Sequence, residues 1–308
     1  MEISRNFNYI FLGLRNSYIL STFSYAMAAN RFLRKKYGEF DIILEDFAPW
    51  NPIFSYRLKH QRPVVLQIQN YLGREIINKY FMLGLPFWML ERYYPLNFSY
   101  HIVLEEALNY RWNIEGKVIS QGVPFTDNLI TEGYYVGYLG RIDIHQKGLD
   151  IFLDAAEALP HIRFVVAGYG VDEKRLIKRI RNTGNINFIG RVSGQSKWKF
   201  IKDARFMVAP SRHEGQSIAV IEAAAMGKPV IVSDIPELKY VEREGFGLSF
   251  RKGNFRDLVE KIEYLWNSEK LLQKYGRRAL GYARQFTWDE VACRYEAYLM
   301  ECLNSFGS

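Results

Sequence analysis

The chain has 308 residues, of which 48% are hydrophobic and 24% are charged. This composition is typical of a folded globular protein rather than a disordered chain, and the length suits two domains of ordinary size or one large one. The net charge is +8, spread along the chain without a nucleic-acid-binding motif. We therefore expect no nucleic-acid partner. The charge suits small anionic ligands or an anionic membrane surface, and equally an ordinary basic protein.

The first half of the chain predicts four short strands, at residues 40–45, 63–69, 99–105 and 117–120. An apolar run at 80–90 lies between the second and third. It contains Gly84 and Pro86 and is shorter than the roughly 20 residues that a membrane span needs. We favour a buried helix with a kink at this run, and the alternative is a surface at a lipid interface.

The second half predicts strands at 134–140, 161–168, 186–190, 204–210 and 228–234. Amphipathic stretches of helical length, such as 149–159 and 171–180, separate them. Continuous apolar strands joined by helical crossovers indicate parallel sheets, so we expect α/β, doubly wound domains.

Polar and turn-forming residues without periodicity mark a boundary near 123–134. We therefore expect domains at 1–128 and 129–286, followed by a helix within 287–308. Thr287 and Glu290 have the spacing of a capping box at the start of that helix. Cys293 and Cys302 lie nine residues apart on it, face opposite ways and should not pair. Residues 1–10 do not resemble a signal peptide, so we expect a cytoplasmic location.

The segment 209–234 predicts a strand, a loop, a helix from about Ser217 and a closing Gly227, followed by another strand. Ligands of parallel sheets bind at the carboxyl ends of the strands, and a helix N-terminus there suits a diphosphate. Glu214 lies in the loop and Glu222 in the helix. Two carboxylates at one strand end are expected to bind hydroxyl groups or to act as acid and base.

Three further strand ends carry glycines or cations. Gly140 follows the strand at 134–140, and Arg141 and Lys147 lie on the same loop. Arginine suits bidentate contact with a phosphate and lysine adds a point charge. The other strand ends hold the sequences AGYG (167–170) and NFIGRVS (187–193). The cations predict contact with a phosphorylated ligand, whereas the turn at 168–170 is equally typical of a plain connection between a strand and a helix.

The order of these motifs, with the Glu-x7-Glu pair formed by Glu214 and Glu222, resembles glycosyltransferase family 4, whose members are retaining enzymes of the GT-B fold. The resemblance covers roughly residues 134–240 well. It implies two Rossmann-like domains facing a cleft. It also implies transfer of a hexose-type sugar from a nucleotide-diphosphate sugar, with UDP- or GDP-sugars expected, to a hydroxyl of a lipid-linked or glycan acceptor.

The resemblance also implies the roles of individual residues. Arg141 and Lys147 would hold the donor diphosphate and Glu214 would contact the transferred sugar, so these three are the predicted catalytic residues. Glu222 would accept hydrogen bonds from the ribose. Many members carry Phe-Gly where this chain has Gln216 and Ser217, which leaves the donor open. The predicted donor-binding residues are Gly140, Gly168, Gly170, Arg191, Val192, Gly215, Gln216, Ser217, Ile218 and Glu222.

The first half resembles the family more weakly. Gln69 and Asn70 occupy the place of a histidine in many members and are the predicted acceptor-side residues. The alternative is that they are hydrogen-bonded in the interior. Residues 121–123 look like the family's interdomain hinge. Residues 1–14 look like its second or third strand, which implies that the N-terminal domain lacks its first β–α unit. We expect a second copy, a partner subunit or the cytoplasmic membrane face to cover the resulting surface.

The chain has no Asp-x-Asp motif, so we expect Arg141 and Lys147 to replace a metal, and no cofactor. No residue is a predicted covalent nucleophile. Same-face attack assisted by the leaving phosphate is therefore the preferred mechanism. Two alternatives stay open. The chain could be a non-catalytic or partner-dependent nucleotide-sugar-binding subunit. It could also be another GT-B enzyme, such as a nucleotide-sugar epimerase, against which the Glu-x7-Glu spacing argues.

Overall fold

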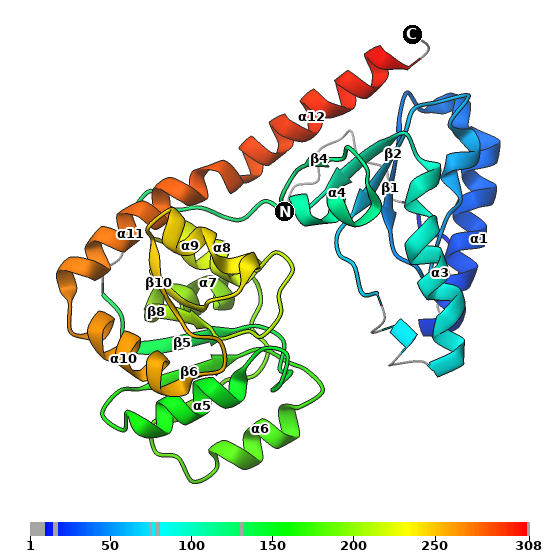
Figure 1. The fold of residues 1–308 in the computed structure, drawn as a ribbon. Helices are drawn as coiled ribbons and strands as arrows, with labels where there is room; N and C mark the ends of the chain where they lie inside the picture. Colours follow the sequence, from blue (N-terminus) through cyan, green and yellow to red (C-terminus); the bar gives the residue numbers. More distant parts are fainter. Residues whose placement is uncertain (1–9, 15–17, 74–75, 78–80, 130–131, 307–308) are drawn as a thin grey trace. The chain divides into compact units, whose positions relative to one another are not determined.

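A computed structural model describes residues 10–14, 18–73, 76–77, 81–129 and 132–306 (Figure 1). The chain forms two compact units. Unit 1 comprises residues 1–120 and 292–308, and unit 2 comprises residues 121–291. The boundary thus lies at Ser120/Gln121, whereas the sequence predicts it at 128/129. Each unit is described by itself.

Unit 1 is built on a parallel sheet in the order β1-β2-β3-β4, in which spatial order follows chain order. All four strands predicted in the first half are present. The helix α1 was not predicted; it has no Gly or Pro and ends in three cations that favour its C-terminus. The elements are α1 (Tyr18–Lys36), η1 (Tyr37–Glu39), β1 (Ile43–Phe47), η2 (Ser55–Leu58), β2 (Val64–Ile68), η3 (Phe81–Gly84), α3 (Leu85–Tyr93), η4 (Pro95–Asn97), β3 (Tyr100–Val103), α4 (Glu106–Trp112) and β4 (Lys117–Val118).

The apolar run at 80–90 differs from its predicted form. Tyr80 lies outside the described residues, and the run divides into η3 and α3 at Gly84/Leu85. Pro86 lies in the first turn of α3, where a missing N–H costs nothing, so it starts a helix rather than kinking one. The prediction of a buried helix is wrong, because Phe81 is 80% exposed and Leu85 and Met89 are about half exposed.

The expected strand within residues 1–14 is not seen where the structure can test it. Residues 10–14 form neither strand nor helix, and residues 1–9 lie outside the described part of the chain.

Unit 2 has a six-stranded, all-parallel sheet in the order β10-β9-β8-β5-β6-β7. The chain order reverses between β5 and β8, so this sheet is doubly wound. The elements are β5 (Tyr135–Leu139), α5 (Leu149–Ala158), β6 (Phe164–Ala167), α6 (Glu173–Ile180), β7 (Ile186–Phe188), α7 (Gly194–Asp203), β8 (Ala204–Ala209), α8 (Ile218–Ala225), β9 (Val230–Ser233), η5 (Pro236–Leu238), α9 (Tyr240–Arg243), β10 (Gly247–Phe250), α10 (Phe255–Trp266), α11 (Glu269–Ala283) and η6 (Arg284–Phe286).

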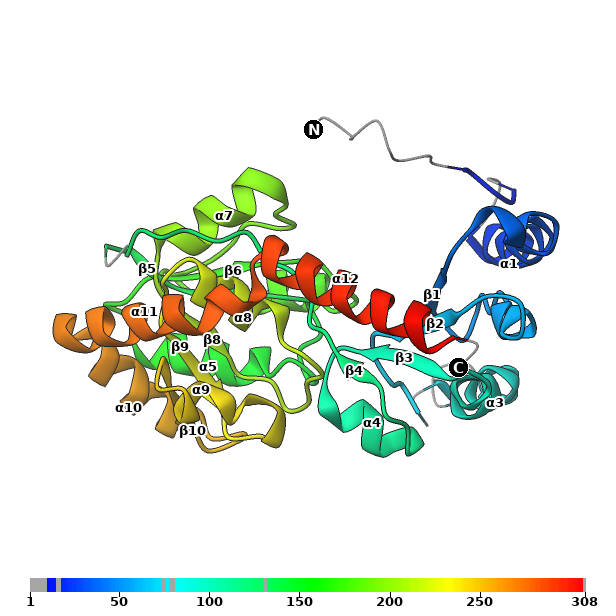
Figure 2. The same cartoon turned by 90° about the horizontal axis from the view of Figure 1, so that it is seen from above.

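Alternate strand residues face two separate cores, one on each side of this sheet. Met207 packs with α7, α8 and α11, whereas its neighbours Phe206 and Val208 pack with α5, α6 and α10. The helices therefore cover both faces, as Figure 2 shows from above. The five predicted strands of this half are all present. The sixth, β10, was not predicted because its four residues include a glycine and a serine and give little apolar signal.

The helix α12 (Trp288–Ser305) begins after Thr287, whose Oγ1 accepts the backbone N–H of Glu290 at 3.3 Å. This is half of the predicted capping box. Residues 292–308 belong to unit 1, where the Tyr295 hydroxyl donates to Gln67 on β2 at 3.1 Å and the Tyr298 hydroxyl accepts the N–H of His101 on β3 at 3.2 Å. Cys293 is exposed and Cys302 is buried, and both are free, as their spacing predicts.

Candidate active site

The candidate site of unit 2 is built by the loops that follow β5 and β8. These strands are neighbours at the point where the strand order reverses. Both loops start at the carboxyl ends of adjacent strands, at the point in an open α/β sheet where ligands bind. Loop 140–148 carries Arg141 and Lys147, and loop 210–217 carries Glu214.

Glycines allow these loops to approach one another closely. A Cβ on Gly148, which has φ +64°, would lie 2.0 Å from the carbonyl oxygen of Pro210 in the other loop. A Cβ on Gly168, with φ +148°, would lie 1.8 Å from the carbonyl oxygen of Gly140. Gly140 N–H in turn bonds the carbonyl of Ala167 at 3.1 Å. A side chain at either position would force the strand ends apart, so both glycines are required by packing.

Lys147 and Glu214 join the two loops directly. Lys147 Nζ lies 2.7 Å from Glu214 Oε2, and the side chains are only 17% and 7% exposed. The other carboxylate oxygen of Glu214 accepts the Ser211 hydroxyl at 2.6 Å. The structure therefore brings two of the three predicted catalytic residues into contact, one from each loop.

Arg141 lies on the same loop but is exposed, and its guanidinium donates to Gln146 Oε1 at 2.7 Å. Its backbone carbonyl accepts the hydroxyl of Tyr138 at 2.9 Å, which fixes the turn after β5. No ion pair within the described part of the chain involves Arg141, so its guanidinium is available to an anion.

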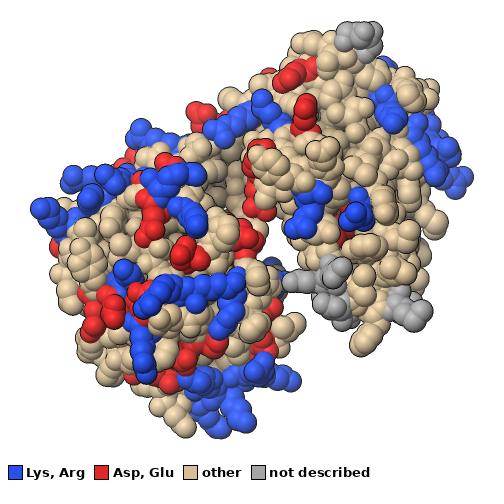
Figure 3. All heavy atoms as spheres, viewed as in Figure 1, with Lys and Arg blue, Asp and Glu red and all other residues tan. Residues whose placement is uncertain are grey.

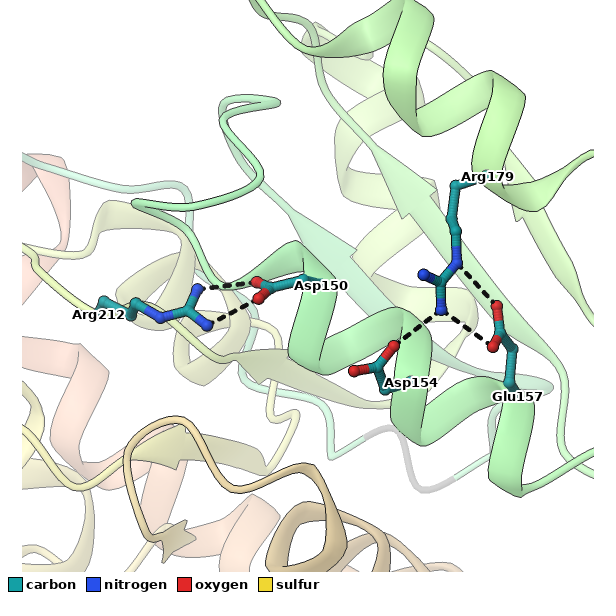
Figure 4. A network of polar contacts seen from close by, with 5 residues as sticks. All are labelled: Asp150, Asp154, Glu157, Arg179 and Arg212. Atoms are coloured by element: carbon teal, nitrogen blue, oxygen red, sulfur yellow. Dashed lines mark hydrogen bonds and ion pairs between the residues drawn. The ribbon is translucent and has the colours of Figure 1, made fainter.

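The loop 210–217 is also fixed from outside the site. Arg212 donates to both carboxylate oxygens of Asp150, at 2.8 and 2.7 Å, as Figure 4 shows. Its backbone N–H bonds the carbonyl of Gln146 at 2.9 Å. Burial acts to raise the pKa of Asp150, but the hydrogen bonds and charge of Arg212 outweigh it and the pKa is lowered. The bidentate pair thus ties the loop bearing Glu214 to the first turn of α5.

The predicted helix from Ser217 is α8, and Ser217 is its N-cap residue. Gly215 is exposed, Gln216 and Ile218 are half-buried and Ser217 is buried, so the loop leads from solvent into the helix. The Gly227 position has φ +68° and closes α8 as expected. Backbone N–H groups at such a terminus carry a partial positive charge that suits a phosphate.

Glu222 lies one turn inside α8 and is 7% exposed. Its Oε1 contacts Lys197 Nζ on α7. Burial raises the pKa of Glu222, and the hydrogen bond and charge of Lys197 oppose that rise. Lys197 was not predicted as a site residue. Its signal in the sequence is weak, because a lysine within an amphipathic helix is usually solvated.

Arg191 and Tyr169 form a flat surface over the ends of β6 and β7. The Arg191 guanidinium lies 4.6 Å from the centre of the Tyr169 ring, which is 57% exposed. Gly168 N–H bonds the carbonyl of Gly190 at 2.8 Å and brings the two loops together. Val192 is half-buried beside Arg191. Tyr169, between the predicted glycines Gly168 and Gly170, was not singled out from the sequence.

Gln69 and Asn70 lie in unit 1 and do not belong to this cluster. Gln69 follows β2 and donates from Nε2 to both carboxylate oxygens of Asp46, each at 2.9 Å. Burial raises the pKa of Asp46, although the bond from Gln69 opposes this. Asn70 is exposed. Asp46, at the end of β1, is a polar partner that the sequence analysis did not identify.

The candidate site in unit 2 combines cations, a helix N-terminus and the paired carboxylate of Glu214 at neighbouring strand ends with the second paired carboxylate, Glu222, in the helix α8 that follows. It can bind an anionic group beside hydroxyl groups. Within the described residues, no group of three or more His, Cys, Asp or Glu side chains could hold a metal ion. Figure 3 shows one face of the molecule, on which cations and acidic side chains are interspersed.

A family model described as "Glycosyl transferases group 1" matches residues 124–281, just over half of the chain. An uncharacterised glycosyltransferase of Methanocaldococcus jannaschii is 29% identical over 190 residues, covering 61% of this chain and 53% of the relative. The phosphatidyl-myo-inositol mannosyltransferase of Mycobacterium leprae is 28% identical over 166 residues, covering 52% and 44%. The chain therefore spans about half the length of the curated relatives it matches.

Two solved structures share the fold over most of the chain. Sucrose-phosphate synthase of Thermosynechococcus elongatus superposes with a TM-score of 0.75 at 19% identity, covering 92% of this chain and 78% of that protein. HepE of Anabaena, in complex with UDP, superposes with a TM-score of 0.70 at 17% identity, covering 89% and 82%. At these identities the likeness shows the α/β fold with parallel sheets that glycosyltransferases of the GT-B type have.

Proposed function

Since the chain belongs to the group 1 glycosyl transferases, we propose that it transfers a hexose-type sugar from a nucleotide-diphosphate sugar with retention of configuration. The observation that carries the proposal is the Lys147–Glu214 pair at the strand-order reversal of unit 2. In the proposal, Lys147 is the cation that contacts a phosphate and Glu214, beside it, is the carboxylate that contacts sugar hydroxyls. A UDP- or GDP-sugar is the proposed donor, and HepE, of the same fold, is named as a complex with UDP.

The proposed donor lies along the strand ends of unit 2. Its diphosphate contacts Arg141, Lys147 and the N-terminus of α8, and its ribose hydroxyls donate to Glu222. The base lies against Arg191 and Tyr169. Sugar hydroxyls donate hydrogen bonds to Glu214. These bonds replace part of the contact between Glu214 and Lys147. This arrangement requires that the ion pairs seen without a ligand reorganise when the donor binds.

Catalysis in this proposal is electrostatic. As the bond to the sugar breaks, negative charge develops on the leaving diphosphate, and Arg141 and Lys147 stabilise it more strongly in the transition state than in the ground state. The acceptor hydroxyl attacks the same face of the oxocarbenium-like sugar and gives its proton to the departing phosphate. These cations also take the place of a metal, so no cofactor is proposed.

The proposed acceptor is a hydroxyl of a lipid-linked or glycan molecule. One mycobacterial relative is named as acting on phosphatidyl-myo-inositol, a membrane lipid. None of the helices in the described residues has the length and apolar character needed to cross a membrane. We propose that this chain attaches peripherally to a cytoplasmic membrane face.

Exposed apolar side chains on two helices of unit 1 support such an attachment. Phe23 and Met27 on α1 are 51% and 72% exposed, and Leu85 and Met89 on α3 are about half exposed. Exposed apolar patches of this kind mark interaction surfaces. We propose that a membrane, a partner subunit or a second copy covers them. Light scattering tests for a second copy and flotation with anionic liposomes tests for a membrane. A strict monomer that ignores liposomes would contradict both, and its solubility at high concentration would show that these side chains need no cover.

The proposed activity is tested in two steps. UDP-, GDP- and ADP-sugars are first screened by thermal shift, since a specific ligand raises the melting temperature by mass action. Turnover of the stabilising donor is then measured with glycan and lipid-linked acceptors. If the donor binds but no tested acceptor supports turnover, the result would favour a nucleotide-sugar-binding subunit. Conversion of the donor to an isomeric nucleotide sugar without acceptor would identify an epimerase.

A further inference from the structure

A small pocket in unit 1 lies apart from the residues described above. It encloses about 160 Å³ between the loop after β2, the C-terminal end of α3 and the C-terminal end of α4. Two of its lining residues are arginines and three are aromatic. The lining residues are Tyr71, Arg92, Tyr93, Leu96, Arg111 and Trp112.

Both arginines are held against aromatic rings. The Arg111 guanidinium lies 4.3 Å from the centre of the Tyr71 ring, which stands perpendicular to Trp112 at 5.2 Å. The Arg92 guanidinium lies 5.7 Å from the centre of the Tyr93 ring. Among the described residues, no ion pair joins either arginine to a carboxylate. Stacking fixes a guanidinium while leaving its N–H groups at the edge available to an acceptor.

Glu91 on α3 directly precedes the lining residue Arg92 and is 1% exposed. Its two carboxylate oxygens accept the backbone N–H groups of Leu72 and Gly73, each at 2.7 Å. Burial raises the pKa of Glu91, and these two hydrogen bonds and the charge of Arg111 oppose the rise. Glu91 thus holds the loop after β2 in place. Among the described residues that line the pocket, two are cations and none is a carboxylate.

We propose that Arg92 and Arg111 bind a phosphate or diphosphate group in this pocket. Two guanidinium groups offer paired N–H donors that match phosphate oxygens, and the aromatic rings beside them limit their movement. The pocket starts on the same loop as Gln69 and Asn70. This assignment rests on the proposed function: the bound group is a phosphate of the acceptor. The acceptor is then a phosphorylated alcohol.

The test uses the full chain and inorganic pyrophosphate as the probe. Calorimetric titration is carried out with the donor site first saturated with UDP, whose own affinity is measured separately. We expect Arg92→Gln/Arg111→Gln to weaken pyrophosphate binding at least tenfold and to leave UDP affinity unchanged. The matched control, Arg34→Gln/Lys35→Gln, removes the same charge from exposed positions on α1 and should change neither. If the double variant has a lowered melting temperature, Arg92→Gln alone tests the pocket, because it keeps Arg111, whose charge acts on Glu91.

Flotation with vesicles of phosphatidylcholine containing phosphatidylglycerol identifies the source of the phosphate. If Arg92→Gln/Arg111→Gln loses pyrophosphate binding but floats with the vesicles as the wild-type protein does, the phosphate belongs to a soluble molecule. Loss of both indicates a lipid headgroup. Equal pyrophosphate affinity in the pocket and control variants would overturn the proposal, as would a loss confined to flotation. A chain that binds pyrophosphate in this pocket but fails to bind any nucleotide would refute the proposed donor and leave the phosphate pocket standing.

Discussion

Lys147 on the loop after β5 and Glu214 on the loop after β8 form an ion pair of 2.7 Å across the strand-order reversal of unit 2. A second pair, between Lys197 and Glu222, lies on the helices α7 and α8. Each glutamate of the Glu-x7-Glu pair thus holds a lysine. In the proposed function, these lysines orient the two carboxylates until donor hydroxyl groups arrive.

Glu222→Ala should weaken donor binding by about 1.5–3 kcal/mol, the usual value of a hydrogen bond to a charged group. The reason is that Glu222 is proposed to accept the ribose hydroxyls. Calorimetry with the donor found by the thermal-shift screen measures the effect. Glu260→Ala, at an exposed position of α10, is the control and should bind normally. Unchanged affinity in a folded Glu222→Ala protein would remove this residue from the site.

Lys197→Met should make donor binding more sensitive to acid. Burial raises the pKa of Glu222 and Lys197 opposes the rise, so the variant raises this pKa further. Only the ionised carboxylate accepts both ribose hydroxyls, and affinity is lost as the pH falls through the pKa. The loss should therefore begin at a higher pH in Lys197→Met than in the wild-type protein. Lys197→Arg should restore the wild-type profile, and superimposable profiles for all three proteins would contradict a positioning role.

Lys147→Ala should lower turnover by about 10²-fold or more, the effect of removing one group that stabilises developing charge. It also leaves Glu214 as a partly buried, unpaired carboxylate, which costs folding stability. The double variant Lys147→Ala/Glu214→Gln separates the two effects. It should recover thermal stability but not turnover. Normal turnover per folded molecule in Lys147→Ala would mean that this lysine is structural.

Turnover should persist in EDTA. The basis is the absent Asp-x-Asp motif together with Arg141 and Lys147 at the proposed diphosphate site. Steady-state rates before and after chelation, with magnesium or manganese added back, provide the measurement. Activity that disappears in EDTA and returns with either metal would show that Arg141 and Lys147 do not take the place of a divalent metal.

Asp150→Asn should destabilise the protein in a pH-dependent way. The bidentate pair with Arg212 lowers the pKa of Asp150 in the folded state below its ordinary value of 3.8. The unfolded chain therefore binds the proton more readily, and the stabilisation is fully present above that ordinary value and is lost as the pH falls through the folded pKa. Thermal melts at neutral pH and near pH 3 should show the difference between wild type and variant shrinking. A constant difference would exclude the ion pair as its cause.

The sequence by itself determined the strands of both units except β10, because buried parallel strands are continuous apolar runs. It also indicated α8 and the start of α12, whose capping and closing residues act locally. The motifs at strand ends identified Arg141, Lys147, Glu214 and Glu222 as site candidates, since function in an α/β fold concentrates where strands end.

Only the tertiary structure decided which of these side chains touch. Lys147 and Glu214 are 67 positions apart, and their contact depends on β5 and β8 being neighbours in the sheet. Lys197 looks like a solvated helix residue until α7 packs beside α8. The exposure of Leu85 and Met89 and the pairing of Arg111 with Tyr71 likewise follow from how α3 and α4 lie on unit 1. Pairwise contacts between distant segments leave no local pattern in a single sequence, so their chemistry appears only when the chain is folded.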